Sequence, residues 1–502
     1  MLDKDKFRLP VIISIIILFL YFLIRLINQS QMTYVFPIDA YANDYSSHIA
    51  HLYFLDVYGY GNVVPNWYNG NYPLFAFYPP LWHFFTLPWY YLSGDVLAAT
   101  FISLILMYII GFLLIYFFSK LNNVSRLESV LFWLFFFANP IAIGVFLRLG
   151  KMPEMFGWLF FILFATAIFY YKDRKIDWRF LIIFTLVYTL FMYAHTLVFI
   201  ISSFLVISLF LVKKTWRERA YIAISCLLTA VLTSPVWYNL VTNASKISTS
   251  PSFFPLKWLI SSSPGTITDK VTAFVVPVIF WIIFYLYFVT NNKSKRILKF
   301  FIVPLIASVL YFSRILVFVP YLNRATPDMY NVFFIFLSCY MLFNIKVERL
   351  NLIVKKTLYF GLLLLPLIGV IISAFYTPWF YPHTKEVNDT FYLVSFVDKN
   401  FLVLNPPRQV SAVGTYSYGA IYYNTSTPSG WSPLNLTLED RQRLQQPDIC
   451  LDRSDCNCLK DSLSVIKTKQ VISYSNSCTV FEACRFRKIK EQGDACLYEY
   501  NY

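Results

Sequence analysis

The stretch "LIIFTLVYTLFMYAHTLVFIISSFLVISLFLV", residues 181–212, is the most informative about how the chain crosses the membrane. It carries no charged side chain and one histidine, His195. Basic segments flank it, "KDRKIDWR" before it and "KKTWRER" after it. Because basic loops stay on the cytoplasmic side of a membrane, both flanks are expected there, and the chain must cross twice between them. Two helices of about 15 residues reach only about 22 Å each, less than a bilayer core. We therefore predict a short helical hairpin that turns near His195, in a recess below the outer surface.

The composition of the whole chain is that of a polytopic membrane protein. Of its 502 residues, 58% are hydrophobic and 14% are charged, and the mean hydropathy is +0.56. These values lie outside the range that is usual for soluble domains. The net charge of +15 comes from Lys and Arg clustered between apolar runs, where membrane topology explains them. The composition therefore predicts a multi-pass protein of the cell membrane and no nucleic-acid partner.

Further apolar runs predict the rest of a membrane domain. Each is long enough to cross a core of about 30 Å, and with the hairpin they give about eleven spans. The basic loops then all fall on one side, with a cytoplasmic N-terminus and an outer C-terminus. The predicted fold is an all-α membrane domain over residues 1–377, with a long first outer loop at residues 28–95. The runs fall near residues 10–27, 96–118, 127–147, 154–171, 220–240, 271–290, 298–319, 328–345 and 357–376.

Residues 378–502 differ in composition and predict a separate extracytoplasmic domain, β-rich or α+β. Alternation in stretches such as "QVSAVGTYSYGAIYY", residues 409–423, predicts strands. Cysteines outside the cell are expected to form disulfides, and a zinc site is the alternative. Six of the eight cysteines lie here: Cys450, Cys456, Cys458, Cys478, Cys484 and Cys496.

The most polar run of the first outer loop is "NDYSSHIAHLYF", residues 43–54. Asp44, His48 and His51 are spaced so that a helix would present all three on one face. One interpretation makes Asp44 the N-cap of that helix and the histidines packing residues. The other makes the three side chains a chemical site.

An aromatic stretch, residues 59–85, follows directly and includes Trp67 and Tyr78. Its many Trp, Tyr, Phe and Pro residues suit a segment that lies at the membrane surface. Aromatic side chains in that position can anchor the segment and also line a groove for a lipid tail or the face of a sugar. The two roles are compatible.

A family resemblance rests on several motifs that occur in order. "ND(x)3H(x)2HL", "GNVVPNW" and "YPLFAFYPPL" resemble the first outer loop of a prokaryotic family of multi-span membrane proteins labelled 6-pyruvoyl-tetrahydropterin synthase-related. That family is similar to the C-type class of membrane glycosyltransferases, which use polyprenyl-phosphate-linked sugars. Four later segments are similar to the family in the same order: "RLGKMPEMFGW" (148–158), "YAHTLVF" (193–199), "NRATPDMY" (323–330) and "TPSGW" (427–431).

The chain also departs from these patterns. Ala194 stands where serine is usual, and "TPSGW" lacks the usual second glycine. The predicted outer segments contain no Asp-x-Asp pair, and there is no Trp-Trp-Asp motif, which argues against the catalytic subunit of an oligosaccharyltransferase. The sequence thus assigns no metal ligands and does not decide whether the reaction uses a divalent cation, Mg²⁺ or Mn²⁺, as a cofactor.

The resemblance implies transfer of a sugar from a polyprenyl-phosphate donor to a hydroxyl group on the outer face, with inversion at the anomeric carbon. Such a reaction needs a base for the proton of the acceptor. In the C-type class this base is an acid soon after the first span, a place that Asp44 matches. His48 is then its companion and Asp39 the alternative base. Glu154 and His195 are expected to orient the acceptor or to support the site.

Cations are needed to stabilise the lipid phosphate as it leaves. The candidates are Arg148, Lys151 and Arg324, all of which the predicted topology puts on the outer side. Arg324 is the first choice because a guanidinium can donate two hydrogen bonds to one phosphate. The alternative is structural: Arg324 would pair with Asp328, and the other two cations with Glu154.

The expected partners are a lipid-linked sugar donor, membrane lipids, and a glycan or glycoprotein acceptor of the cell envelope. Two other functions fit the same features. One is a transporter or flippase of lipid-linked glycans, and the other is a noncatalytic protein of envelope-glycan assembly. A transporter is expected to show internal repeats, and the sequence has no clear repeat.

Overall fold

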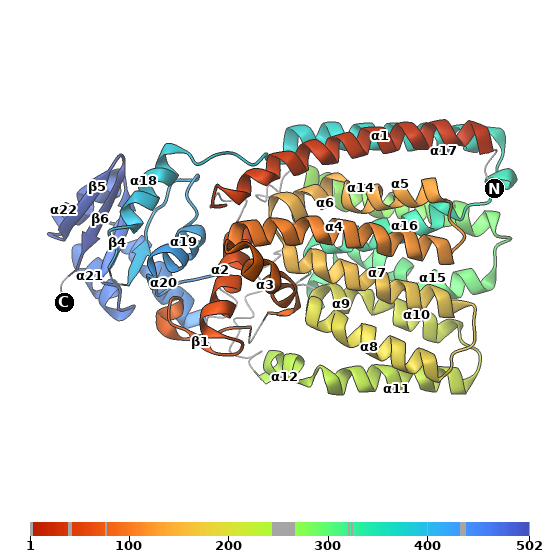
Figure 1. The fold of residues 1–502 in the computed structure, drawn as a ribbon, viewed down its shortest axis with the longest axis horizontal. Helices are drawn as coiled ribbons and strands as arrows, with labels where there is room; N and C mark the ends of the chain where they lie inside the picture. The colour runs from red at the N-terminus through yellow and green to blue at the C-terminus, as the bar shows by residue number, and fades with distance from the viewer. Residues whose placement is uncertain are drawn as a thin grey trace.

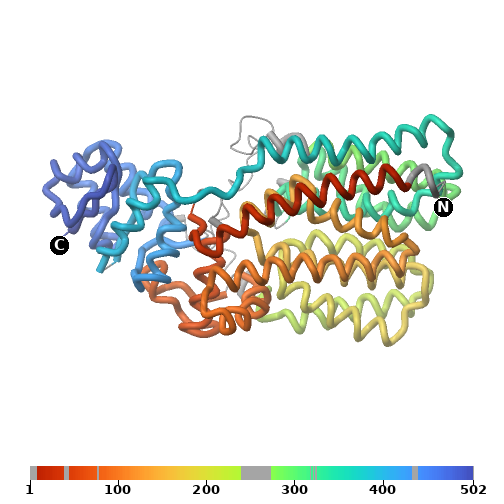
Figure 2. The backbone as a smooth tube through the Cα atoms, turned by 45° about the horizontal axis from the view of Figure 1, so that its top comes forward, coloured from red at the N-terminus to blue at the C-terminus, as the bar shows by residue number. Residues whose placement is uncertain are grey.

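A computed structural model describes residues 4–38, 43–75, 78–242, 267–319, 322, 325–398, 400–431 and 438–500. A bundle of long helices makes up one part of the molecule, and a smaller domain of helices and strands lies at one end of it (Figure 1). The first helix starts at the far end of the bundle, so the two ends of the chain lie at opposite ends of the molecule (Figure 1, Figure 2).

The apolar composition of the bundle fits a multi-pass membrane protein. Among the described residues, five helices are long and apolar enough to cross a membrane, and a sixth is added if one bent pair counts as a span. The predicted count of about eleven spans and the sides on which the two termini lie stay predictions. The five helices lie in α1 (Lys4–Gln29), α4 (Val96–Leu121), α7 (Met152–Lys172), α14 (Ile267–Thr290) and α17 (Leu352–Tyr376).

The first and last long helices of the bundle, α1 and α17, lie side by side (Figure 1). The hydroxyl of Ser14 donates to the carbonyl of Leu362 over 2.7 Å, and the hydroxyl of Tyr21 donates to Ser373 Oγ over 2.7 Å. Hydrogen bonds of this kind join helices where lipid tails offer no polar partner. The other helices here are α11 (Trp216–Leu232), α12 (Ser234–Thr242), α15 (Lys295–Phe312), η5 (Ile315–Phe318), α16 (Pro327–Phe343) and η7 (Val347–Arg349).

The predicted helical hairpin is present. His195 has an extended backbone (φ −164°, ψ 111°), and its Nδ1 accepts a hydrogen bond from the backbone N–H of Val198, so it ends one helix and caps the next. The chain then runs back, because the ring of Tyr188 stacks on Phe199 and its hydroxyl lies 2.6 Å from Ser203 Oγ. The elements are α8 (Trp178–Ala194), α9 (Thr196–Ser202) and α10 (Phe204–Val212).

The run predicted at residues 127–147 is a bent helix rather than a straight span. The side chain of Asn139 accepts hydrogen bonds from the N–H groups of Ile141 and Ala142, and Pro140 starts the new segment. The new helical segment, residues 140–148, is bent by 47° from the helix that precedes it. The segments are α5 (Arg126–Phe137), α6 (Pro140–Ala142) and the π-helix η3 (Ile143–Arg148), whose last residue is one of the predicted cations.

The first outer loop folds into a compact unit around α2. The two short strands β1 and β2 pair in antiparallel fashion beside this helix. Phe54 of α2 and Trp67 of the loop meet edge to face with ring centroids 5.0 Å apart, and both are fully buried. The elements are η1 (Ser30–Thr33), α2 (Asn43–Tyr58), β1 (Val63–Val64), η2 (Tyr68–Gly70), β2 (Tyr72–Pro73) and α3 (Leu81–Ser93).

The C-terminal region has an α+β fold around one sheet in the order β3-β4-β6-β5. Strands β3 and β4 are parallel, and the other neighbours are antiparallel. The six cysteines form three disulfides, Cys450–Cys458, Cys456–Cys484 and Cys478–Cys496, which confirms that prediction and leaves no thiol here for zinc. The elements are α18 (Lys385–Val394), β3 (Phe401–Val403), α19 (Ala412–Tyr423), α20 (Leu438–Asp452), α21 (Cys456–Val465), β4 (Gln470–Tyr474), α22 (Asn476–Ala483), β5 (Arg487–Gln492) and β6 (Ala495–Glu499).

The prediction of strands at residues 409–423 is wrong, because this stretch contains α19. Ser411 caps the helix, and its Oγ accepts a hydrogen bond from the N–H of Gly414. A Cβ added at Gly414 would come 2.7 Å from Ile38, so the helix packs tightly on the segment that precedes α2. Small residues that alternate with tyrosines suit the two-residue period of a strand and also the 3.6-residue period of a helix. The close packing against Ile38 favours the helix.

Candidate functional site

The start of α2 packs directly on a turn of the bundle. Gly150 adopts a left-handed conformation (φ +75°), and a Cβ added there would come within 2.1 Å of the ring of Tyr45. Only glycine combines this φ with so close a neighbour. Lys151 follows this glycine and precedes α7, and Asp44 precedes Tyr45 in the first turn of α2. The contact therefore brings a carboxylate of the outer loop to a cation of the bundle.

Lys151 lies among three carboxyl groups. Its Nζ is 2.8 Å from Oδ2 of Asp328 and 3.6 Å from Oε2 of Glu154. Glu154 is 1% exposed, and its Oε1 accepts a hydrogen bond of 3.3 Å from Trp158 Nε1. Asp44 is the third carboxyl group that interacts with this ammonium. We call Asp44, Lys151, Glu154 and Asp328 the acid–lysine cluster.

The two charges of this cluster that lie outside the spans stabilise each other. Burial raises the pKa of the Asp44 carboxyl, and Lys151 counteracts that rise. Burial alone would lower the pKa of Lys151, but the three carboxyl groups raise it above its ordinary value. Lys151 is therefore an ammonium ion throughout the physiological range, and Asp44 is a stronger base than a carboxyl group in water.

Aromatic side chains from three parts of the chain surround Asp44. The indole Nε1 of Trp431, from the C-terminal domain, donates a hydrogen bond of 3.2 Å to Asp44 Oδ1. Tyr78 lies with its ring centroid 5.0 Å from Trp431 and 6.3 Å from His195. His195 stands at the turn of the hairpin, packed against Gly157, where a Cβ would come within 2.5 Å of it. The outer loop, the bundle and the C-terminal domain thus meet at this point.

Three buried histidines lie beside this cluster. One ring nitrogen from each of His48, His51 and His83 lies within 4.8 Å of the others, and their exposures are 1%, 0% and 0%. Nδ1 of His51 donates to the carbonyl of Ser47 over 2.6 Å, and its Nε2 accepts from the hydroxyl of Tyr72 over 2.6 Å. We call the three histidines the histidine cluster.

The histidine cluster is uncharged and only partly satisfied. Within the described residues, no ring nitrogen of His48 or His83 makes a hydrogen bond of normal geometry. Each buried polar group left without a partner costs about 1–3 kcal/mol. Burial lowers the pKa of His51 to about 4 and holds the pKa of His48 and of His83 well below the ordinary value. All three rings are therefore neutral at neutral pH.

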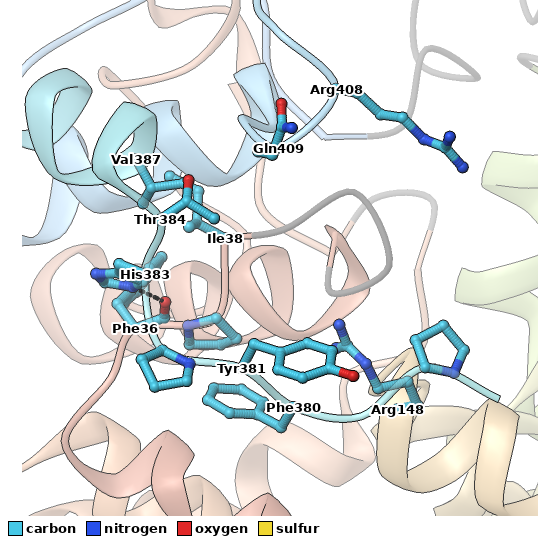
Figure 3. A pocket seen from close by; sticks show the side chains of 13 residues that line it. Phe36, Ile38, Arg148, Phe380, Tyr381, His383, Thr384, Val387, Arg408 and Gln409 are labelled. Atoms are coloured by element: carbon cyan, nitrogen blue, oxygen red, sulfur yellow. Dashed lines mark hydrogen bonds between the residues drawn. The ribbon is translucent and has the colours of Figure 1, made fainter. Parts of the chain in front are cut away.

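Arg148 lies in a different place from Lys151. It lines a pocket of about 310 Å³ between the bundle and the C-terminal region, together with Tyr381, His383 and Arg408 (Figure 3). Its guanidinium is 5.9 Å from the ring centroid of Phe380. In the chain, only Leu149 and Gly150 stand between Lys151 and Arg148, which ends the π-helix.

An apolar cleft of about 210 Å³ opens among the helices of the bundle. It is lined by side chains of α1, α5, α14, α16 and α17, which are almost entirely hydrocarbon. A cleft of this composition suits an acyl or prenyl chain. Its lining includes Leu18, Phe135, Ile279, Ile335, Leu342 and Leu365.

Of the residues predicted from the sequence, Asp44, Lys151, Glu154, His195 and Tyr78 are brought together. Other predicted residues lie outside this group, although His48 borders it, with its ring centroid 5.4 Å from that of Tyr78. His48 makes no hydrogen bond to Asp44 and belongs to the histidine cluster, Trp67 is fully buried behind His51, and Arg148 lines the separate pocket. Asp39 and Arg324 lie outside the described residues.

Sequence reasoning missed three residues of the site. Asp328 was considered only as the partner of Arg324 in the structural alternative, and the structure pairs it with Lys151, which is 177 positions away in the chain. Trp431 belongs to "TPSGW", and that resemblance was the signal that could have placed it at the site. His83 lies inside the aromatic stretch, where nothing in the spacing connects it to His51.

No family model matches the chain, and no curated protein matches its sequence. Solved structures do match. The oligosaccharyltransferase AglB of Archaeoglobus fulgidus, in complex with an inhibitory peptide and a dolichol-phosphate, aligns with a TM-score of 0.59 at 9% identity, over 94% of this chain and 70% of that one. The arabinofuranosyltransferase AftD from Mycobacteria aligns with a TM-score of 0.58 at 12% identity, over 100% of this chain. The chain has the fold of the C-type membrane glycosyltransferases. It spans 40% of the length of AftD.

Proposed function

We propose that this protein is a membrane glycosyltransferase that moves a sugar from a polyprenyl-phosphate donor to a hydroxyl acceptor on the outer face of the membrane. The observation that carries the proposal is the meeting of Asp44, from the first outer loop, with Lys151 and its carboxylate partners at the bundle. The C-type fold supports it, and so does the dolichol-phosphate bound to AglB in its solved structure.

Asp44 is the proposed general base. It takes the proton of the acceptor hydroxyl while the acceptor oxygen forms a bond to the anomeric carbon of the sugar. The bond from that carbon to the phosphate oxygen breaks at the same time, and its electron pair leaves with the lipid phosphate. Attack opposite the leaving group inverts the anomeric carbon. Partial burial makes Asp44 a stronger base, and Lys151 offsets part of that effect.

The donor would use two of the surfaces described above. We assign part of its hydrocarbon chain to the apolar cleft of about 210 Å³, and its phosphate requires cations. The acid–lysine cluster holds three carboxyl groups and one ammonium, so it does not itself attract a phosphate. We assign the phosphate contacts to Arg148 and Arg324, and the stacking face for a sugar to Tyr78 and Trp431. Glu154 and His195 would then face the acceptor.

The test is a transfer assay with purified protein and a panel of polyprenyl-phosphate sugars, in which release of the lipid phosphate is followed. We expect Asp44→Asn to fold normally and to lose about 100- to 10,000-fold in rate, the usual contribution of a general base. Asp56→Asn is the matched control, because Asp56 lies on the same helix and is exposed. It should transfer sugar at the wild-type rate.

Other outcomes would change the proposal. If Asp44→Asn keeps its activity, Asp44 is not the base, and Asp39 takes its place as the candidate. If neither wild type nor variant releases lipid phosphate from any donor, while both bind donors tightly, the transport or flippase function is favoured instead.

A further inference from the structure

We infer that His48, His51 and His83 form a binding site for a transition-metal ion, and that Zn²⁺ is the ion their ligand set suits best. Three imidazole nitrogens gathered within 4.8 Å of one another are a sufficient protein ligand set for zinc. The inference does not rest on the proposed transfer reaction, because metal content is measured without any sugar donor.

The state of the rings favours metal binding. His48 and His83 are buried, and their ring nitrogens have no hydrogen bond of normal geometry within the described part of the chain. A metal ion would satisfy one nitrogen of each ring.

His51 already has the outer contact of a metal ligand. Its Nδ1–H donates to the carbonyl of Ser47, which leaves Nε2 as the ring nitrogen that can bind an ion. Metal-bound histidines usually donate their second ring N–H in this way. The hydroxyl of Tyr72, 2.6 Å from Nε2, is within reach as a fourth ligand. Nitrogens around a tetrahedral zinc ion lie about 3.4 Å apart, so the rings must close by about 1 Å when the ion binds.

The ligand type separates this site from a catalytic Mg²⁺ or Mn²⁺ site. Those ions prefer oxygen ligands, whereas imidazole suits Zn²⁺, Cu²⁺, Ni²⁺ and Co²⁺. The ligands come from α2 and α3, and Tyr72 comes from β2 between them. One ion would therefore tie together three elements of the first outer loop. Asp44 lies one helical turn before His48, so the ion would position the proposed base without touching it.

A packing role for the histidines is the competing explanation, and His83→Phe distinguishes the two. The ring centroid of His83 lies 4.7 Å from that of Phe75 and 4.8 Å from that of Trp82, and phenylalanine keeps an aromatic ring there without the nitrogens that could bind metal. If the cluster only packs, Zn²⁺ should have no effect on the Tm of either the wild type or the variant. If the cluster binds metal, the variant should lose both the ion and the stability that the ion provides.

The experiment uses the full chain, purified in detergent without a histidine tag. Metal content is measured by mass spectrometry, and thermal unfolding is measured after chelation and again after Zn²⁺ is restored. We expect about one zinc ion per chain, a rise in Tm on restoration, and little metal in His83→Phe. His383→Gln is the matched control, because His383 lies in another pocket and hydrogen-bonds to the carbonyl of Phe36; it should keep its zinc.

A second measurement needs no variant. Co²⁺ added to the chelated wild-type protein should give the strong visible absorption of a four-coordinate site, and Zn²⁺ should remove it. A folded wild-type protein that holds no zinc, shows no change in Tm with Zn²⁺ and gives no cobalt spectrum would overturn the inference. So would a His83→Phe variant that retains the full metal content.

Discussion

The two groups of side chains that meet at α2 differ in how their buried polar atoms are stabilised. In the acid–lysine cluster, carboxyl groups surround one ammonium ion, and the closest pair, Lys151 and Asp328, is 2.8 Å apart. In the histidine cluster all three rings are neutral, and no ring nitrogen of His48 or His83 makes a hydrogen bond of normal geometry within the described residues. The first cluster pairs its charged groups with one another. The second presents ring nitrogens that are open to a ligand.

Trp431 is the side chain that touches both groups. Its indole N–H bonds to Asp44, while its ring lies with centroids 5.2 Å from His48 and 5.3 Å from His51. This residue comes from the C-terminal domain, so that domain contributes directly to the candidate site. Variants in the acid–lysine cluster and at Trp431 itself can show whether the two clusters act separately.

The largest effect is expected from Lys151→Met, which removes the only ammonium that the described residues place among these carboxyl groups. Breaking one partner of a buried ion pair usually lowers the free energy of unfolding by about 3–5 kcal/mol. We expect a clear drop in Tm in detergent. Lys120→Met, at the exposed end of α4, should have no such effect. Adding Asp328→Asn to Lys151→Met should restore part of the loss, and equal Tm values for both lysine variants would contradict the pairing.

A smaller effect is expected from Trp431→Phe, which removes the indole N–H but keeps an aromatic ring. A hydrogen bond to a charged group is worth about 1.5–3 kcal/mol, so kcat/KM for transfer should fall about tenfold or more. The metal content should stay at the wild-type level. Trp379→Phe is the control, because it removes an indole hydrogen bond of the same 3.2 Å length, to the carbonyl of Ala374. Loss of metal in Trp431→Phe would mean that the two clusters are not independent.

The smallest effect is a displacement of the pH profile. A general base must be deprotonated, so transfer is lost as the pH falls through its pKa. Burial raises the pKa of Asp44 and Lys151 lowers it, so removing Lys151 leaves the rise uncompensated. The acidic limb of kcat/KM should therefore move to higher pH in Lys151→Met. An acidic limb that stays in place would indicate that another group takes the proton.

Local sequence patterns predicted the parts of this fold that depend on local chemistry. Basic flanks on both sides of residues 181–212 predicted the hairpin that turns at His195, and the cysteine content of the C-terminal region predicted its disulfides. Both follow from rules that need no tertiary contact. The helix over residues 412–423 was missed because its alternating pattern resembles a strand and its packing against Ile38 decides the outcome.

The candidate site was only partly predictable for a similar reason. The spacing of Asp44 and His48 placed them on one helical face, and the structure bears out that helix. Spacing could not reveal that Asp44 meets Lys151 while His48 turns toward His83. Contacts such as Lys151 with Asp328 join distant parts of the chain, and a single sequence gives no sign of them.

The contact between Gly150 and Tyr45 makes the chemistry of Asp44 depend on the position of the outer loop. With α2 seated on this glycine, Asp44 shares the field of Lys151 and is partly shielded from water. If α2 lifted away, Lys151 would stay paired with Asp328 and Glu154, and Asp44 would become an ordinary exposed acid. A base strong enough for the reaction would then exist only in the closed arrangement, so that opening to admit an acceptor and activating it would be successive steps.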